Sequence, residues 1–180
     1  MKRNFPHLEL PIPPGRRDEW AAEAAQIPSS DTPTQCERFF VVRLGGEWFG
    51  LPAEILANTQ PDVIPRKLPH SRPFIEGMVN ADGRVIVCLA IEKILGVLPA
   101  TGGVDAPRLL ILHGQKWNCA FRVRQVLGLE EIDMAGLQPL AAGAGEILRQ
   151  GARGVVLHHG RAVVCLGAEG FLGKLLEAVR

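Results

Sequence analysis

The 180-residue chain contains no tyrosine, and its few serines lie only in proline-rich stretches, at Ser29, Ser30 and Ser71. No Gly-x-Ser-x-Gly motif accompanies them, so the sharp turn that presents a serine nucleophile in many hydrolases is excluded. The glycine-rich loops typical of nucleotide-binding proteins are absent as well. We therefore predict that the protein is not an enzyme, has no catalytic residues and uses no cofactor.

An excess of one sign of charge is also missing, because 20 Lys and Arg residues balance 19 Asp and Glu residues. A chain with so small a net charge has no strong field to attract nucleic acid or anionic lipid. Residues 1–20 contain no apolar signal segment, and no stretch approaches the roughly eighteen apolar residues that span a bilayer. We expect a soluble, cytoplasmic protein with no nucleic-acid partner and no direct membrane insertion.

Cysteines are few and unpaired in sequence. The four cysteines include no Cys-x-x-Cys motif, so neither a zinc knuckle nor a disulfide scaffold is indicated. Cys88, Cys119 and Cys165 lie within apolar, strand-like runs, where we expect buried and reduced thiols.

The histidines and acids offer no obvious metal site either. His158 and His159 are adjacent, so on a strand their side chains would point to opposite faces and could not bind one ion. An acidic cluster that includes Glu130 and Asp133 follows an apparent strand at 123–127, and we expect it to form a solvated face. The sequence therefore predicts no metal site.

What the chain does have is an internal repeat. Residues 77–96 and 154–173 align without a gap and are identical at ten of twenty positions, where the composition would give about two. A weaker pairing precedes it, since residues 39–52 and 108–121 share an apolar run, a glycine and a tryptophan. A repeat of this kind indicates a fold built twice from the same part.

Turn signals divide each copy into short strands. Residues 39–44 and 47–52 predict one hairpin, and residues 74–80 and 84–89 predict a second, whose turn ends at Gly83. Such short strands, with little helix between them, are typical of small, curved antiparallel barrels. We predict an all-β protein.

The predicted domain boundaries follow the repeat. The two barrel units are placed at approximately 39–98 and 108–167, and a C-terminal amphipathic helix follows at 168–180. Neither unit is large enough to bury much surface alone, so we expect the two to pack together with a groove between them.

Residues 1–36 stand apart, because six prolines interrupt any periodic pattern there. We predict a flexible N-terminal arm with one short helix after Asp18, whose apolar face carries Trp20 and Ile27. That face is suited to dock either on the chain's own body or on another protein.

Three segments in a fixed order carry a resemblance to a known family: LGGEWFGLP at 44–52, PFIEGMVNADGRVIVCLAIEKILG at 73–96, and RGVVLHHGRAVVCL at 153–166. They resemble the CheW family of chemosensory adaptors, whose halves each carry such a hairpin, with a proline-rich loop before the first. The resemblance covers the chain from about residue 38 onward. It implies that residues 37–180 form two tandem SH3-like, five-stranded β-barrels.

The resemblance also implies a function. Members of the CheW family are scaffolds that couple chemoreceptors, the methyl-accepting chemotaxis proteins, to the regulatory domain of a CheA-type histidine kinase in a membrane-associated array. The receptor's helical tip would lie in the groove between the barrels, and an edge of the first barrel would pair with the kinase. The Val-Cys-Leu segments resemble the second CheW-type adaptor of Wsp-like surface-sensing pathways, which control a diguanylate cyclase.

Position in the family motif selects seven candidate partner-binding residues, namely Leu56, Asn58, Met78, Asn80, Asp82, Gly83 and Arg84. Asp82 stands where the family has an arginine and Asn58 where it has an acid, so the ion pair that these positions often form is absent. Leu56 and Met78 are also explained as core residues, and Asn80 and Gly83 as parts of a turn.

Two other interpretations remain open at this stage. In one, a diverged CheW-like interaction domain serves another protein assembly, through residues 1–36. In the other, the chain is a small β-barrel enzyme or a nucleic-acid binder.

Overall fold

The computed structural model describes residues 35–98, 106–114 and 117–179. The chain divides into two units, Met1–Pro33 and Thr34–Arg180, and all described residues belong to the second. The arm predicted at 1–36, with its helix after Asp18, therefore lies almost wholly outside the described residues. Within the described part of the chain, no helix is long and apolar enough to cross a membrane.

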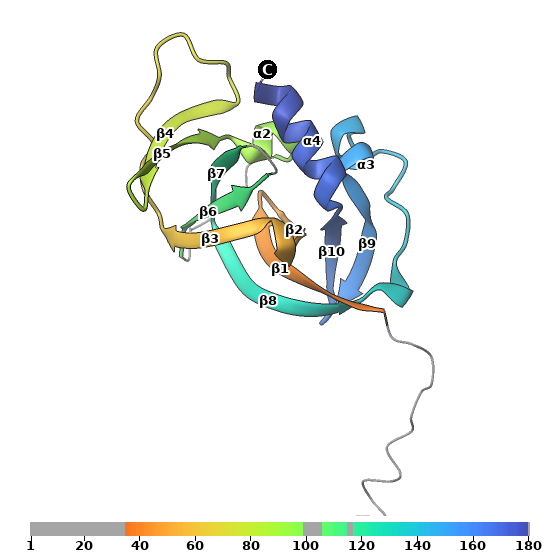
Figure 1. The fold of residues 1–180 in the computed structure, drawn as a ribbon. Helices are drawn as coiled ribbons and strands as arrows, with labels where there is room; N and C mark the ends of the chain where they lie inside the picture. The colour runs from red at the N-terminus through yellow and green to blue at the C-terminus, as the bar shows by residue number, and fades with distance from the viewer. Residues whose placement is uncertain (1–34, 99–105, 115–116, 180) are drawn as a thin grey trace, which may run out of the picture. The chain divides into compact units, whose positions relative to one another are not determined.

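Short strands dominate the described residues, as expected for an all-β protein (Figure 1). The elements, in chain order, are β1 (Cys36–Leu44), β2 (Glu47–Pro52), η1 (Ala53–Ile55), β3 (Leu56–Pro61), β4 (Ile75–Ala81), β5 (Arg84–Leu89), α2 (Ile91–Leu95), β6 (Arg108–His113), β7 (Asn118–Val123), β8 (Gln125–Asp133), η2 (Met134–Gly136), α3 (Glu146–Gly151), β9 (Ala152–His158), β10 (Arg161–Leu166) and α4 (Ala168–Val179). Both predicted hairpins are confirmed, as β1–β2 and β4–β5. The predicted C-terminal helix is confirmed as α4.

The strands form two five-stranded sheets. Sheet A has the order β8-β1-β2-β10-β9, and sheet B has the order β3-β6-β7-β5-β4. Each sheet takes two strands from one copy of the repeat and three from the other. The copies meet through two equivalent parallel pairings, β2 with β10 and β5 with β7, and two antiparallel pairings, β1 with β8 and β3 with β6.

This exchange corrects the barrel boundaries expected at 39–98 and 108–167. Those limits delimit the two copies of the repeat, but each copy contributes strands to both sheets. A pattern of apolar residues shows which faces of a strand are buried, and it carries no information on which copy supplies the neighbouring strand.

Two equivalent isolated β-bridges, called crossings below, help to close the curved sheets. Arg66, between β3 and β4, exchanges two backbone hydrogen bonds with Met78, of 2.8 and 2.9 Å. Gln138 exchanges two with Val155, both of 2.8 Å. Met78 and Val155 are matched positions of the repeat, so the two barrels are completed in the same way.

A glycine is required just before each crossing, because the backbone of the bridging segment approaches too closely for a side chain. A Cβ atom on Gly77 would lie 2.3 Å from the carbonyl oxygen of Arg66, and one on Gly154 would lie 2.4 Å from that of Gln138. Both glycines also have positive φ, of 147° and 157°. Since no other residue fits such a position without strain, this identical pair of the repeat serves the fold.

The inner strands β2 and β10 in sheet A and β6 and β7 in sheet B are largely buried on both faces, which explains their continuous apolar runs. One cluster of side chains belongs to sheet A and one to sheet B, and a third, larger cluster is shared by the two sheets. Neighbouring residues alternate between them, since Val41 lies in the sheet A cluster and Val42 in the shared core. Helix α4 adds Phe171 and Leu175 to the shared core.

Candidate functional site

The β4–β5 hairpin carries most of the candidate partner-binding residues. Its turn places Asp82 at φ 51° and Gly83 at φ 79°. Two successive left-handed residues are typical of the type I′ turn, whose twist matches that of the strands it joins. Aspartate tolerates this conformation better than most residues with a side chain. The prediction of a turn at this point is confirmed.

Asn58 and Asp82 are brought into contact across the barrel. They lie on β3 and at the β4–β5 turn, at the two outer strands of sheet B. Nδ2 of Asn58 donates a hydrogen bond of 3.1 Å to Oδ2 of Asp82, while Oδ1 of Asn58 accepts one of 2.7 Å from the Thr59 backbone. The two positions are therefore joined without an ion pair, by an amide and a carboxylate.

The other candidates divide into exposed and structural residues. Asn80 and Arg84 are exposed, and Asn80 pairs with Val85, which is 67% exposed. Leu56 is half-buried against the shared core, and Met78 is half-buried and closes the barrel through its backbone. The exposed surface available to a partner is therefore formed by the polar residues of the set.

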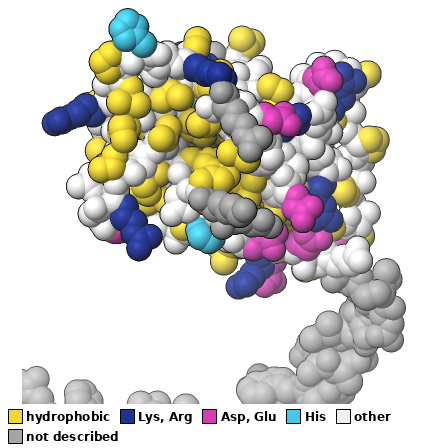
Figure 2. All heavy atoms as spheres, turned by 45° about the horizontal axis from the view of Figure 1, so that its top comes forward, with side chains coloured by type: hydrophobic (Ala, Val, Ile, Leu, Met, Phe, Trp, Pro, Cys, Tyr) yellow, Lys and Arg dark blue, Asp and Glu magenta, His cyan; other side chains and the backbone are white. Residues whose placement is uncertain are grey.

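A groove of about 630 Å³ lies beside α4. Apolar lining residues include Ile55, Trp117 and Leu172, and exposed acids at Glu54 and Glu169 also line it. Seen from the α4 side, apolar side chains form a broad area with charged side chains mainly around it (Figure 2). Ile55 in the groove lining directly precedes Leu56, the first residue of β3 and the first of the candidate partner-binding residues.

A second groove, of about 1010 Å³, is lined in part by Trp48 of β2. The guanidinium groups of Arg43 and Arg161 each lie 5.7 Å from the centroid of the Trp48 ring, a cation–π distance. Trp48 and Trp117 are the tryptophans of the weaker repeat, so each copy supplies one tryptophan to a groove. Sequence reasoning missed both as site residues, although their pairing was the signal.

Cys88 and Cys165 are matched positions of the repeat and lie in the clusters of sheets B and A. Burial raises the pKa of Cys88 to about 12, and the carboxylate of Glu76 raises it too. Burial raises the pKa of Cys165 to about 11, while the Arg153 guanidinium acts to lower it. Burial also raises the pKa of Cys119 to about 12. The prediction of buried thiols is confirmed, and none of the three is a nucleophile near neutral pH.

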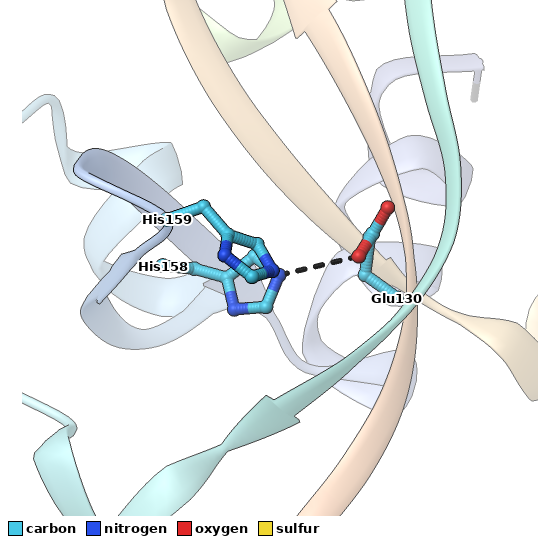
Figure 3. Close-up of side chains that lie close together, drawn as sticks. All are labelled: Glu130, His158 and His159. Carbon is cyan, nitrogen blue, oxygen red and sulfur yellow. Dashed lines mark hydrogen bonds and ion pairs between the residues drawn. The ribbon is translucent and has the colours of Figure 1, made fainter.

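The β9–β10 hairpin carries a cluster that the sequence did not predict. Strand β9 ends at His158, and His159 begins the turn at φ 47°, so the two rings lie beside one another with centroids 4.1 Å apart (Figure 3). Nε2 of His158 lies 3.3 Å from Oε2 of Glu130 on β8. The expectation that the two histidines face opposite sides is wrong, because the strand does not continue through both.

The acidic cluster also differs from expectation. Glu130 and Asp133 lie within β8, which continues well beyond the predicted end at residue 127. Asp133 is exposed, as expected, and its carboxylate accepts a hydrogen bond from the backbone of Ala135. Glu130 is half-buried and faces His158, so only part of the cluster is a solvated face.

A family model described as the CheW-like domain matches residues 38–175. Among solved structures, the chain is similar to the crystal structure of scaffolding protein TtCheW from Thermoanaerobacter tengcongensis. The identity is 20% and the TM-score 0.62, and the match covers 73% of this chain and 89% of that chain. At this identity the likeness is one of fold. No curated protein matches the chain by sequence.

Proposed function

The chain belongs to the CheW-like domain family, a family of non-catalytic scaffolds in chemotaxis signalling, and we propose that it couples chemoreceptors to a CheA-type histidine kinase. In this role it holds the receptor's cytoplasmic signalling tip and the regulatory domain of the kinase in one array at the membrane. A scaffold that binds the two signalling states of the array with different affinity shifts their populations without any chemistry of its own.

The contact between Asn58 and Asp82 is the observation that carries this proposal. The family motif selects both positions as a pair near the receptor surface, although 24 residues separate them in the chain. Their side chains meet at 3.1 Å on an exposed surface. Because aspartate here replaces the arginine of the family, we propose that the pair still recognises a receptor but selects one with a complementary, more basic contact surface.

The groove beside α4 supplies an apolar surface suited to a receptor helix. An amphipathic helix binds in such a groove by placing residues spaced three and four apart on the apolar floor. Leu172 and Trp117 offer that floor, and Glu54 and Glu169 offer a charged margin. We place the receptor tip here, next to the first residues of β3.

The most specific part of the proposal concerns the pathway that the kinase controls. The Val-Cys-Leu segments of β5 and β10 resemble the second adaptor of Wsp-like systems, so we propose an array whose kinase controls a diguanylate cyclase. Both segments are buried in the fold, with Cys88 and Cys165 at no more than 1% exposure. Because they are buried, they indicate only a subfamily relationship, and we assign them no role in partner binding.

Reconstitution tests the proposed coupling. The full chain is mixed with a purified receptor cytoplasmic fragment and a CheA-type kinase from the same cell, and co-sedimentation and kinase autophosphorylation are measured. We expect a ternary complex and a receptor-dependent change in phosphorylation, both requiring the chain. Failure of the chain to bind either partner contradicts the proposal.

Two variants on α4 test the groove separately. Leu172→Lys places a charge in the groove lining, and we expect receptor binding to weaken at least tenfold while kinase binding is kept. Glu177→Ala, on the same helix outside the groove, is the matched control and should leave both unchanged. Equal receptor affinity for the two variants places the receptor tip elsewhere.

A further inference from the structure

We propose that Glu130, His158 and His159 form a binding site for a divalent transition-metal ion of the Zn²⁺ class, which fastens the β9–β10 hairpin to β8. The inference does not depend on the coupling of receptor and kinase. It follows from the cluster in Figure 3, where both imidazole rings lie on the side of the hairpin that faces the Glu130 carboxylate.

The distances are close to those of a tetrahedral site. One ligand atom from each of the three residues can be chosen so that all lie within 4.8 Å of one another. In a tetrahedral zinc site with bonds of about 2.0–2.2 Å, neighbouring ligand atoms lie about 3.3–3.6 Å apart. Nε2 of His158 and Oε2 of Glu130 already meet this spacing at 3.3 Å, and a ring nitrogen of His159 lies within 4.8 Å of a ligand atom of each.

The donor atoms select the class of metal. Two imidazole nitrogens and one carboxylate oxygen suit Zn²⁺, Ni²⁺ or Cu²⁺, whereas Ca²⁺ and Mg²⁺ prefer sites made of oxygen. Three protein ligands leave one position of a tetrahedron for water. Among the described residues, this is the one group of three or more potential ligands that lies close enough together.

The surroundings favour a defined site over a chance surface encounter. The side chain of His158 is 14% exposed and that of Glu130 is 32% exposed, so both are already held by the fold. Arg161 pairs with His158 across the hairpin, and its guanidinium group stacks on Trp48. The guanidinium group next to His158 in the hairpin register is thus engaged by an aromatic ring.

The position of the cluster indicates what the ion would do. β8 and β9 are the two outer strands of sheet A, and they do not pair with each other in the sheet. An ion held by Glu130 on β8 and by both histidines at the end of β9 links these strands at the mouth of the barrel. Because the unfolded chain does not present these ligands together, the bound ion stabilises the fold.

Calorimetric titration of the full chain with Zn²⁺ tests the site. The exposed Cys36 is replaced in all proteins, as Cys36→Ser, so that its thiol cannot compete for the metal. We expect one ion per chain, and at least about tenfold weaker binding in His158→Ala and in Glu130→Gln, because these changes remove a ligand. Absence of Zn²⁺ binding by the parent chain, or parent-like affinity in either variant, overturns the proposal.

His159→Asn separates metal binding from folding. Asparagine followed by glycine is the preferred pair in a type I′ turn, so this variant should melt at the same or a higher temperature without metal. We expect it to lose the rise in melting temperature that Zn²⁺ gives the parent chain. The matched control is His113→Asn, an exposed histidine on β6 outside the cluster, which should keep that rise. A full Zn²⁺-dependent rise in His159→Asn overturns the site.

Discussion

The β4–β5 and β9–β10 hairpins are built on the same backbone plan and end in different chemistry. Each has a glycine with large positive φ near its start, a type I′ turn with a second glycine, and a buried cysteine on the returning strand. At the tip, however, one hairpin presents Asp82 to Asn58, and the other presents His158 to Glu130.

The difference separates constraint by the fold from freedom at the surface. The matched Gly77 and Gly154 and the matched, buried cysteines lie where a larger or charged side chain would not fit. The unmatched turn residues Asp82 and His159 are exposed, and a side chain there costs the fold little, so selection by a partner or an ion can act on them. Each hairpin tip nonetheless reaches a side chain on the opposite outer strand of its own sheet.

Replacing the glycines at the crossings should have the largest effect on stability. We expect Gly77→Ala and Gly154→Ala each to lower the free energy of unfolding by about 2–4 kcal/mol, because the new Cβ meets a carbonyl oxygen at an unfavourable φ. Urea unfolding measures this loss. Gly128→Ala, at φ 119° with no atom within 4 Å, is the control and should cost clearly less. A large loss at one crossing alone would break the equivalence of the hairpins.

The buried thiols should make the fold sensitive to alkaline pH. An exposed thiol titrates near pH 9, whereas the pKa of Cys88 is raised to about 12 in the folded protein. Unfolding therefore releases protons between pH 9 and 12, and stability falls with rising pH by at most about 1.4 kcal/mol per unit for each thiol. Urea unfolding of the parent chain and of Cys88→Ala, from pH 8 to about pH 10, measures the slope. An identical slope in both contradicts the assignment.

Alkylation rates should distinguish the two matched cysteines. Arg153 acts to lower the pKa of Cys165, whereas Glu76 at the matched position raises that of Cys88. With similar opening of the two barrels, the Cys165 thiol loses its proton more readily, so we expect it to react faster than Cys88 near pH 10. Mass spectrometry of the modified peptides gives both rates. In Glu76→Gln the difference between the two alkylation rates should narrow. An unchanged difference would mean that access of the reagent to each thiol, and not the thiol pKa, sets the rates.

The polar contact at the β4–β5 tip should matter least for stability. We expect Asn58→Ala to lower the free energy of unfolding by less than about 1 kcal/mol, because the hydrogen bond to Asp82 is exposed. Thermal melting measures the change, and Thr59→Ala on the same strand is the control. A loss of several kcal/mol would show that the contact serves the fold in place of recognition.

Much of this architecture is predictable from the repeat. The predictions that were wrong have physical causes. Hairpins and helix α4 are set by local turn and burial patterns, which the sequence displays directly. The exchange of strands between sheets depends on long-range pairing, on which periodicity carries no information. The histidine cluster was missed because one left-handed residue at His159 reverses the chain. The hydrogen bond between Asn58 and Asp82 could not be predicted from local patterns, because it forms only when the two outer strands of sheet B come together.

The most direct test of the account compares one substitution at the two matched turn positions. Asp82→Arg and His159→Arg place the same residue at φ 51° and φ 47°, so they share the same backbone strain. In the reconstituted array we predict that Asp82→Arg changes receptor affinity at least tenfold, while His159→Arg leaves it at the parent value. Equal effects of the two variants, or none in either, would contradict the assignment of receptor recognition to the β4–β5 tip.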